Sequence, residues 1–132
     1  MDEMNEKTSS QAEDLAKALD RLEEALNEEK DDFVRDSVIQ RFEFCFELCW
    51  KLAKNFNTAQ GKETFTPKDS FRVGAQVGYI EKPEVWFEYL KARNLASHTY
   101  NEATSEKVYQ AAKNFLADGR NLLVRIRALS SS

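Results

Sequence analysis

Several features that would assign this chain to familiar classes are missing from its sequence. No apolar run approaches the roughly 18 residues that a membrane span requires, and the first residues lack the basic-then-apolar order of a signal peptide. The alternation of apolar and polar residues that marks strands is absent. Only two cysteines are present, Cys45 and Cys49, and without a secretory signal they predict reduced thiols in a cytoplasmic protein.

The ligands for a metal site or a nucleotide cradle are also too few. His98 is the only histidine, and two cysteines with one distant histidine do not complete a tetrahedral zinc site. Both thiols fall on an apolar helix face, where cysteine behaves as a small hydrophobe. Gly74 and Gly78 follow no strand and lack a phosphate-loop lysine, so they predict a close helix crossing instead. We therefore expect no metal and no cofactor.

Charge is unevenly distributed along the chain. The formal net charge is −4, but residues 1–32 alone carry −8, with twelve acids and four bases. The remaining hundred residues carry eleven acids and fifteen bases, a balance of +4. The bulk of the domain is therefore mildly basic, which suits a phosphate-bearing ligand.

The sequence does contain long stretches with helical periodicity. Apolar residues recur at three- and four-residue steps, and capping signals divide the chain into five helices. We expect these helices at about 10–29, 34–60, 67–78, 83–101 and 104–129. The expected caps are Ser10 with Glu13, Thr66 before Pro67, and Thr104 or Ser105, with Gly61 as a stop. The prediction is an all-α, antiparallel up-down bundle, one domain over 1–132 with frayed ends at 1–8 and 130–132.

The helix at 34–60 has an unusually broad apolar face. Its apolar positions cover roughly 200° of the helical wheel, more than one core contact requires. This helix is therefore central in the bundle, or it also contacts another chain. Arg41 falls on the apolar side, where a guanidinium needs a partner, and we favour a structural ion pair over a ligand contact. Glu47 and Lys51 have the favourable i, i+4 spacing.

Polar residues concentrate between positions 93 and 101. On a regular helix Arg93 and Tyr100 would share one face, with Ser97 between them, and His98 would lie about 140° away from Arg93. A site using both Arg93 and His98 then needs local unwinding, a substrate that spans them, or a second copy of the chain. A lone histidine on an amphipathic helix is more often structural, and Tyr100 also fits a core tyrosine.

The pattern Arg93-Asn94-x-x-Ser97-His98-x-Tyr100 resembles the Arg-x-x-x-x-His-x-Tyr signature of the HEPN superfamily. The run from Phe33 to Lys51 resembles the second helix of one branch, the nucleotidyltransferase substrate-binding protein family, and residues 67–72 resemble that family too. The resemblance extends over nearly the whole chain after residue 10.

This resemblance implies a helical bundle that dimerises and works with a separate, small nucleotidyltransferase subunit in a toxin–antitoxin-like module. It implies that Tyr100 is a candidate acceptor of transferred nucleotide. The alternative is a metal-independent ribonuclease in which Arg93 stabilises phosphate charge and His98 moves protons, with two chains contributing two histidines. We favour the binding or target role over the nuclease. The candidate residues for binding nucleotide or RNA are Asn94, Ser97, Tyr100, Asn101 and Arg41.

Overall fold

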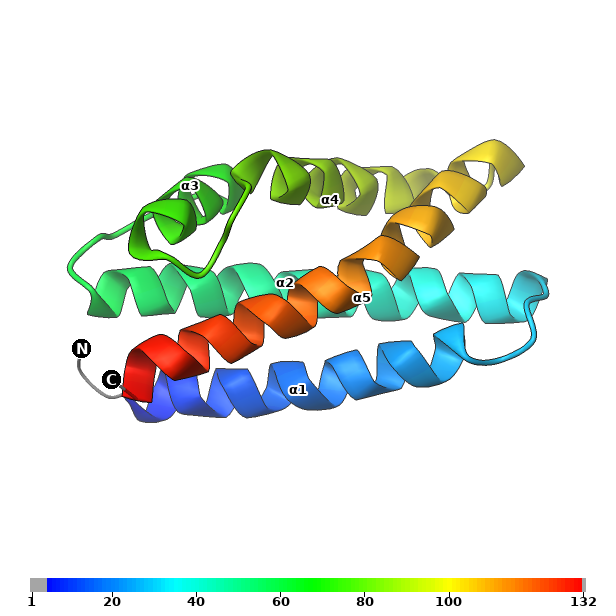
Figure 1. Cartoon of the computed structure of the whole chain (residues 1–132). Coiled ribbons are helices and arrows are strands. Elements are labelled where there is room, and N and C mark those ends of the chain that lie inside the picture. Colours follow the sequence, from blue (N-terminus) through cyan, green and yellow to red (C-terminus); the bar gives the residue numbers. More distant parts are fainter. Residues whose placement is uncertain (1–4, 132) are drawn as a thin grey trace.

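The computed structural model describes residues 5–131, and within that range the chain forms a bundle of five α-helices (Figure 1). The helices are α1 (Glu6–Leu26), α2 (Asp32–Ala59), α3 (Pro67–Val77), α4 (Pro83–Leu95) and α5 (Glu102–Ser131). A short 3-10 helix, η1 (Ala96–His98), follows α4. Helices α1 and α2 run antiparallel, α3 and α4 lie along the other side of α2, and α5 crosses obliquely. The predicted all-α bundle is therefore confirmed.

The ends of α2 and α3 follow local signals that were readable in the sequence. The Thr66 hydroxyl accepts a hydrogen bond from the Asp69 amide at 3.2 Å, and Pro67 occupies the first turn of α3. Gly78, with φ of 113°, ends that helix in the left-handed conformation that glycine adopts at little cost. Gly61, with φ of 80°, similarly follows α2. Short-range hydrogen bonding thus sets these boundaries.

Other helix ends differ from the expectation. Helix α1 begins at Glu6, because the Asn5 side chain accepts from the Thr8 amide at 2.9 Å, so the predicted capping box at Ser10 is wrong. The expected fraying over 1–8 does not extend to residues 6–8, which form the first turn of α1. At the other end α5 is helical through Ser131. The rest of the expected frayed ends, residues 1–4 and 132, lie outside the described range.

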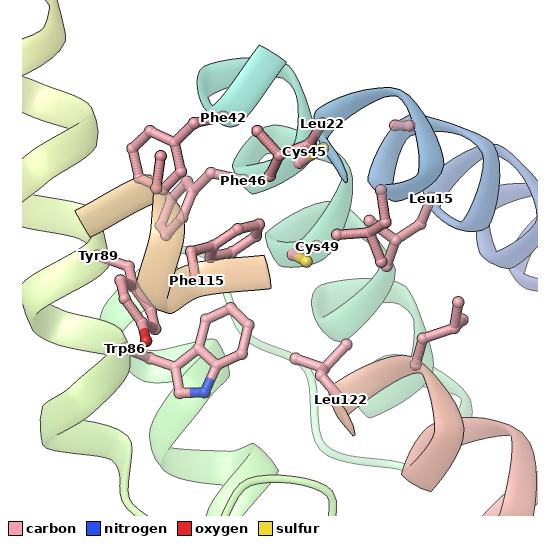
Figure 2. Close-up of a cluster of buried hydrophobic side chains, with 14 of the residues drawn as sticks. Leu15, Leu22, Phe42, Cys45, Phe46, Cys49, Trp86, Tyr89, Phe115 and Leu122 are labelled. Atoms are coloured by element: carbon pink, nitrogen blue, oxygen red, sulfur yellow. The ribbon is translucent and has the colours of Figure 1, made fainter. Parts of the chain in front are cut away.

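An aromatic cluster joins α2, α4 and α5 in the core (Figure 2). The Phe115 ring of α5 contacts Phe42 of α2 at a centroid distance of 5.2 Å, and Trp86 and Tyr89 of α4 at 5.7 and 5.4 Å. These contacts are edge-on, the arrangement that aromatic quadrupoles favour. Because α2 contacts all four other helices, its broad apolar face is explained first by its central position.

The two cysteines belong to this core. Cys45 and Cys49 are fully buried on α2 (Figure 2). Burial raises the pKa of the Cys45 thiol to about 12, and the pKa of Cys49 is also raised by burial. Both side chains are therefore neutral thiols that pack as hydrophobes, as predicted.

Two glycines allow close packing. A Cβ atom on Gly119 of α5 would lie 3.0 Å from Cδ2 of Leu19, which brings α5 close against α1. A Cβ atom on Gly74 of α3 would lie 2.7 Å from Cε1 of Tyr79. Gly74 therefore accommodates the buried Tyr79 ring.

None of the helices found in residues 5–131 combines the length and the apolarity that crossing a bilayer requires.

Candidate functional site

The segment 93–101 does not continue as one α-helix. Helix α4 ends at Leu95, and the chain tightens into η1 before it turns into α5. The Ser105 hydroxyl donates to the Thr99 carbonyl at 2.8 Å, and the Asn101 side chain accepts from the Thr104 amide at 3.2 Å. Asn101, not Thr104 or Ser105, therefore caps α5. The expected helix to residue 101 is wrong because these contacts stabilise the reversal into α5.

His98 and Tyr100 lie next to each other on this connection. Their ring centroids are 6.0 Å apart, and the ring planes are nearly perpendicular at 86°. His98 is exposed, and Tyr100 has 88% of its surface accessible. Tyr100 is thus no core tyrosine. It lies beside His98, whereas a regular helix would have placed it on the same face as Arg93.

Arg93 faces α2 from the last turn of α4. Its guanidinium donates to Glu47 Oε1 and lies 5.3 Å from the centre of the Phe46 ring. The other carboxylate oxygen of Glu47 accepts from the indole nitrogen of Trp50 at 3.2 Å. Glu47 therefore accepts hydrogen bonds from Arg93 and Trp50, and not from Lys51, the partner that the i, i+4 spacing had suggested. The Arg93 Nε is buried and has no acceptor among the described residues.

A second carboxylate lies near the Arg93 guanidinium. Glu43 is one helical turn before Glu47 on α2, and partial burial raises the pKa of its carboxyl, while the charge of Arg93 acts in the opposite direction. Neither Glu43 nor Glu47 was among the site residues predicted from the sequence. Their i, i+4 spacing was visible, but only the packing of α4 on α2 shows that they face Arg93.

The other polar residues of the segment have distinct surroundings. Asn94 is exposed and lines the same groove as His98. The Ser97 hydroxyl donates to the Asn94 carbonyl at 3.1 Å, a local contact that supports η1. Asn94 and His98 are therefore together at one groove, whereas Ser97 and Asn101 form hydrogen bonds that shape the turn.

Arg41 lies on a different surface. It donates to the backbone carbonyl of Arg21 at 2.5 Å, so its partner is a carbonyl oxygen and not the expected carboxylate. It lines a groove of about 750 Å³ between α1 and α2, together with Phe44, Glu43 and Glu47. Arg41 is therefore grouped with the carboxylates near Arg93, and not with the groove that contains His98.

Among the residues that the structure describes, no three His, Cys, Asp or Glu side chains gather closely enough to hold a metal ion. The polar groups that this segment offers to a ligand are an imidazole, a phenol, an amide and a half-buried guanidinium.

These features match a known family of proteins. Residues 10–128 match the family model described as "Nucleotidyltransferase substrate binding protein like", and the chain belongs to this family. The resemblance inferred from the sequence is thereby confirmed.

The chain is also similar to three individual proteins. It is 32% identical over 94 residues to a protein of Haemophilus influenzae named "Probable ribonuclease HepT", in a match that spans 67% of this chain and 64% of that relative. A solved structure from Thermus thermophilus has a TM-score of 0.80 and 31% identity, and the match covers 86% of this chain and 98% of that one. A Shewanella oneidensis HEPN toxin, tri-AMPylated and in complex with the MNT antitoxin, has a TM-score of 0.78 at 23% identity, with 95% and 99% covered. The last likeness establishes a common fold.

Proposed function

We propose that this chain is the HEPN-type target subunit of a separate minimal nucleotidyltransferase in a toxin–antitoxin-like module, with Tyr100 as the nucleotide acceptor. The observation that carries the proposal is the 88% exposure of Tyr100 on the connection between α4 and α5. A phenol there is open to the active site of another protein. The family description and the AMPylated state of the Shewanella toxin support this assignment.

The transfer is a displacement at phosphorus. The Tyr100 phenol oxygen forms a bond to the α-phosphorus of ATP, the bond from that phosphorus to the bridging oxygen breaks, and pyrophosphate leaves. The phenolic proton passes to a base of the nucleotidyltransferase or to water. The product is a phosphodiester with a negative charge beside the His98 ring, which repels an RNA phosphate from the same place.

Intact-mass measurement tests this function. Incubation with the cognate nucleotidyltransferase and ATP should increase the mass of the chain by whole AMP units. Tyr100→Phe should abolish the increase without loss of helicity, because the side chain is exposed. Tyr109→Phe is the matched control. Tyr109 is only 6% exposed and should not be modified, so this variant should gain the same mass as the wild type. An unchanged mass in the presence of an active partner would exclude the acceptor role.

A second candidate function is RNA cleavage. It is supported by the exposed His98 in a groove with Asn94 and Lys91, and by the name of the Haemophilus relative. In this reaction the 2′-oxygen of RNA bonds to the adjacent phosphorus and the bond to the 5′-oxygen breaks. An imidazole takes the 2′ proton or protonates the leaving 5′-oxygen. A guanidinium stabilises the charge of the pentacoordinate phosphate.

This nuclease needs two copies of the chain. Arg93 faces α2 and His98 lines the groove on the outer side of α4, so one copy does not present both to the same groove. A second copy supplies the missing group, and we propose a homodimer in which the two 93–100 segments border a shared cleft. Phe44 is 61% exposed and lines the groove between α1 and α2, which suits an interface.

Two measurements address the nuclease. Light scattering should give a dimer, and Phe44→Glu should shift it towards monomer; a monomer at all concentrations would count against the shared cleft. His98→Ala should abolish RNA cleavage with little change in melting temperature, because the imidazole is exposed. Arg93→Lys should also reduce cleavage, since the ammonium group of lysine does not replace the planar, forked guanidinium of arginine. If the wild-type chain cuts no RNA, the acceptor function stands alone.

A further inference from the structure

A groove extends along the outer side of α4 from Phe87 to His98. Its volume is about 540 Å³, and it is open to solvent at the surface formed by α3, α4 and η1. The lining residues are Lys68, Phe87, Glu88, Leu90, Lys91, Asn94, Leu95 and His98. His98, the candidate catalytic histidine, is therefore one end of a longer surface feature.

At the other end of this groove the Phe87 ring lies close to two cations, of which Lys68 lines the groove and Arg72 lies beside it. Phe87 is only partly buried, and the Lys68 Nζ lies 5.6 Å from the centre of its ring. The Arg72 Cζ lies 5.1 Å from the same ring centre. Arg72 pairs with Asp69 at 3.0 Å, yet 54% of its side chain stays exposed. Both cations thus remain accessible to an anion beside the ring.

The groove between these ends has an apolar floor and a polar rim. Leu90 and Leu95 are partly buried, whereas Lys91 and Asn94 are exposed. Among the lining residues of the described chain, Glu88 supplies the one carboxylate. Packing of α3 on α4 would account for a cation on Phe87, but it does not account for an apolar floor with a further exposed lysine, Lys91, that continues to His98.

Proteins that bind single strands combine a positively charged groove with aromatic side chains on which bases stack. We propose that this groove binds single-stranded RNA, with a base against Phe87 and phosphates on Lys68, Arg72 and Lys91, and delivers the strand to His98. Phe87 and His98 are eleven residues apart, about 16 Å along helical backbone, so they serve different nucleotides. This inference rests on the proposed nuclease and assigns its substrate contacts beyond the reacting phosphate.

RNA binding to this groove is measured separately from RNA cleavage. The probe is a fluorescein-labelled RNA of roughly ten nucleotides, within the usual site size of single-strand binders, with every 2′-hydroxyl methylated so that it cannot be cut. Fluorescence anisotropy gives Kd at several salt concentrations. We expect Lys68→Ala and Arg72→Ala each to weaken binding and to reduce the slope of log K against log salt by about 0.7.

The aromatic contact is tested with two replacements of Phe87. Phe87→Leu keeps an apolar side chain but removes the flat ring, and we expect about tenfold weaker binding, within the usual range for one stacked base. Phe87→Tyr keeps the ring and should bind like the wild type. Lys113→Ala is the charge control, because Lys113 lies 5.9 Å from the Tyr109 ring of α5 and does not line the groove.

The outcomes separate this inference from the functions on which it rests. Equal binding by Phe87→Leu and the wild type, or an unchanged salt slope in Lys68→Ala and Arg72→Ala, would overturn the groove as an RNA site. Equal losses in Lys113→Ala would overturn it too, since they would indicate nonspecific charge attraction. Tight binding that depends on Phe87, without cleavage of unmodified RNA, would support the groove and refute the nuclease.

Discussion

The contact between Arg93 and Glu47 gives the sharpest quantitative test of this structure. Glu47→Gln keeps the size of the side chain but removes the charge that balances the half-buried guanidinium. A hydrogen bond to a charged group contributes about 1.5–3 kcal/mol. The exposed fractions of the two side chains, 26% and 35%, reduce this through solvent screening. We therefore expect a loss of about 1–2 kcal/mol in the free energy of unfolding.

Urea denaturation followed by circular dichroism measures this loss. With an m-value of about 2 kcal/mol per molar, within the usual range for a small domain, the midpoint should fall by roughly 0.5–1 M at unchanged m. A double-mutant cycle with Arg93→Gln isolates the pair and should give a coupling of about 1 kcal/mol. A coupling energy below about 0.3 kcal/mol would contradict this expectation, because so small a value is typical of an exposed ion pair that solvent screens.

The same substitution has a consequence for activity. Glu47 competes with any phosphate for the Arg93 guanidinium, so the proposed nuclease must displace it when RNA binds. Glu47→Gln should then retain or raise RNA cleavage while it lowers stability, whereas Arg93→Lys should lower both. Loss of cleavage in Glu47→Gln, with the fold and the dimer intact, would show that the carboxylate itself participates.

Three further predictions concern the bundle. Gly74→Ala should cost about 1–3 kcal/mol of unfolding free energy, measured by urea denaturation, because its Cβ would lie 2.7 Å from the buried Tyr79 ring. Glu102 receives two hydrogen bonds from Arg35, at 2.7 and 3.0 Å, which lower the pKa of its carboxyl from its ordinary value. This stabilisation is full above the unfolded pKa and is lost as the pH falls through the lower folded value. Glu102→Gln should accordingly lower the melting temperature relative to the wild type at neutral pH, but not in acid. An equal decrease at neutral and acidic pH would contradict this prediction. Cys49 should resist a thiol reagent at neutral pH until urea unfolds the chain, since burial raises its pKa and blocks access.

Some contacts between residues a few positions apart were predictable from the sequence, although the caps expected at Ser10 and at Thr104 or Ser105 were wrong. The Thr66 cap and Pro67 start of α3 were identified because capping hydrogen bonds join neighbouring residues. The width of the apolar face of α2 predicted either a central position or a contact with another chain, and within the described chain α2 contacts all four other helices. The motif 93–100 and the family also came from the sequence, because they depend on residue order alone.

Only the tertiary structure decided how the candidate site is arranged. Periodicity favoured a helix to residue 101, but the chain must reverse from α4 into α5, and Asn101 and Ser105 stabilise that reversal. Tyr100 therefore lies beside His98 and not on the Arg93 face. Glu47 binds Arg93, 46 positions away, in place of the nearby Lys51. Contacts between helices determine these positions, since packing brings together residues whose separation in sequence leaves no periodic signal.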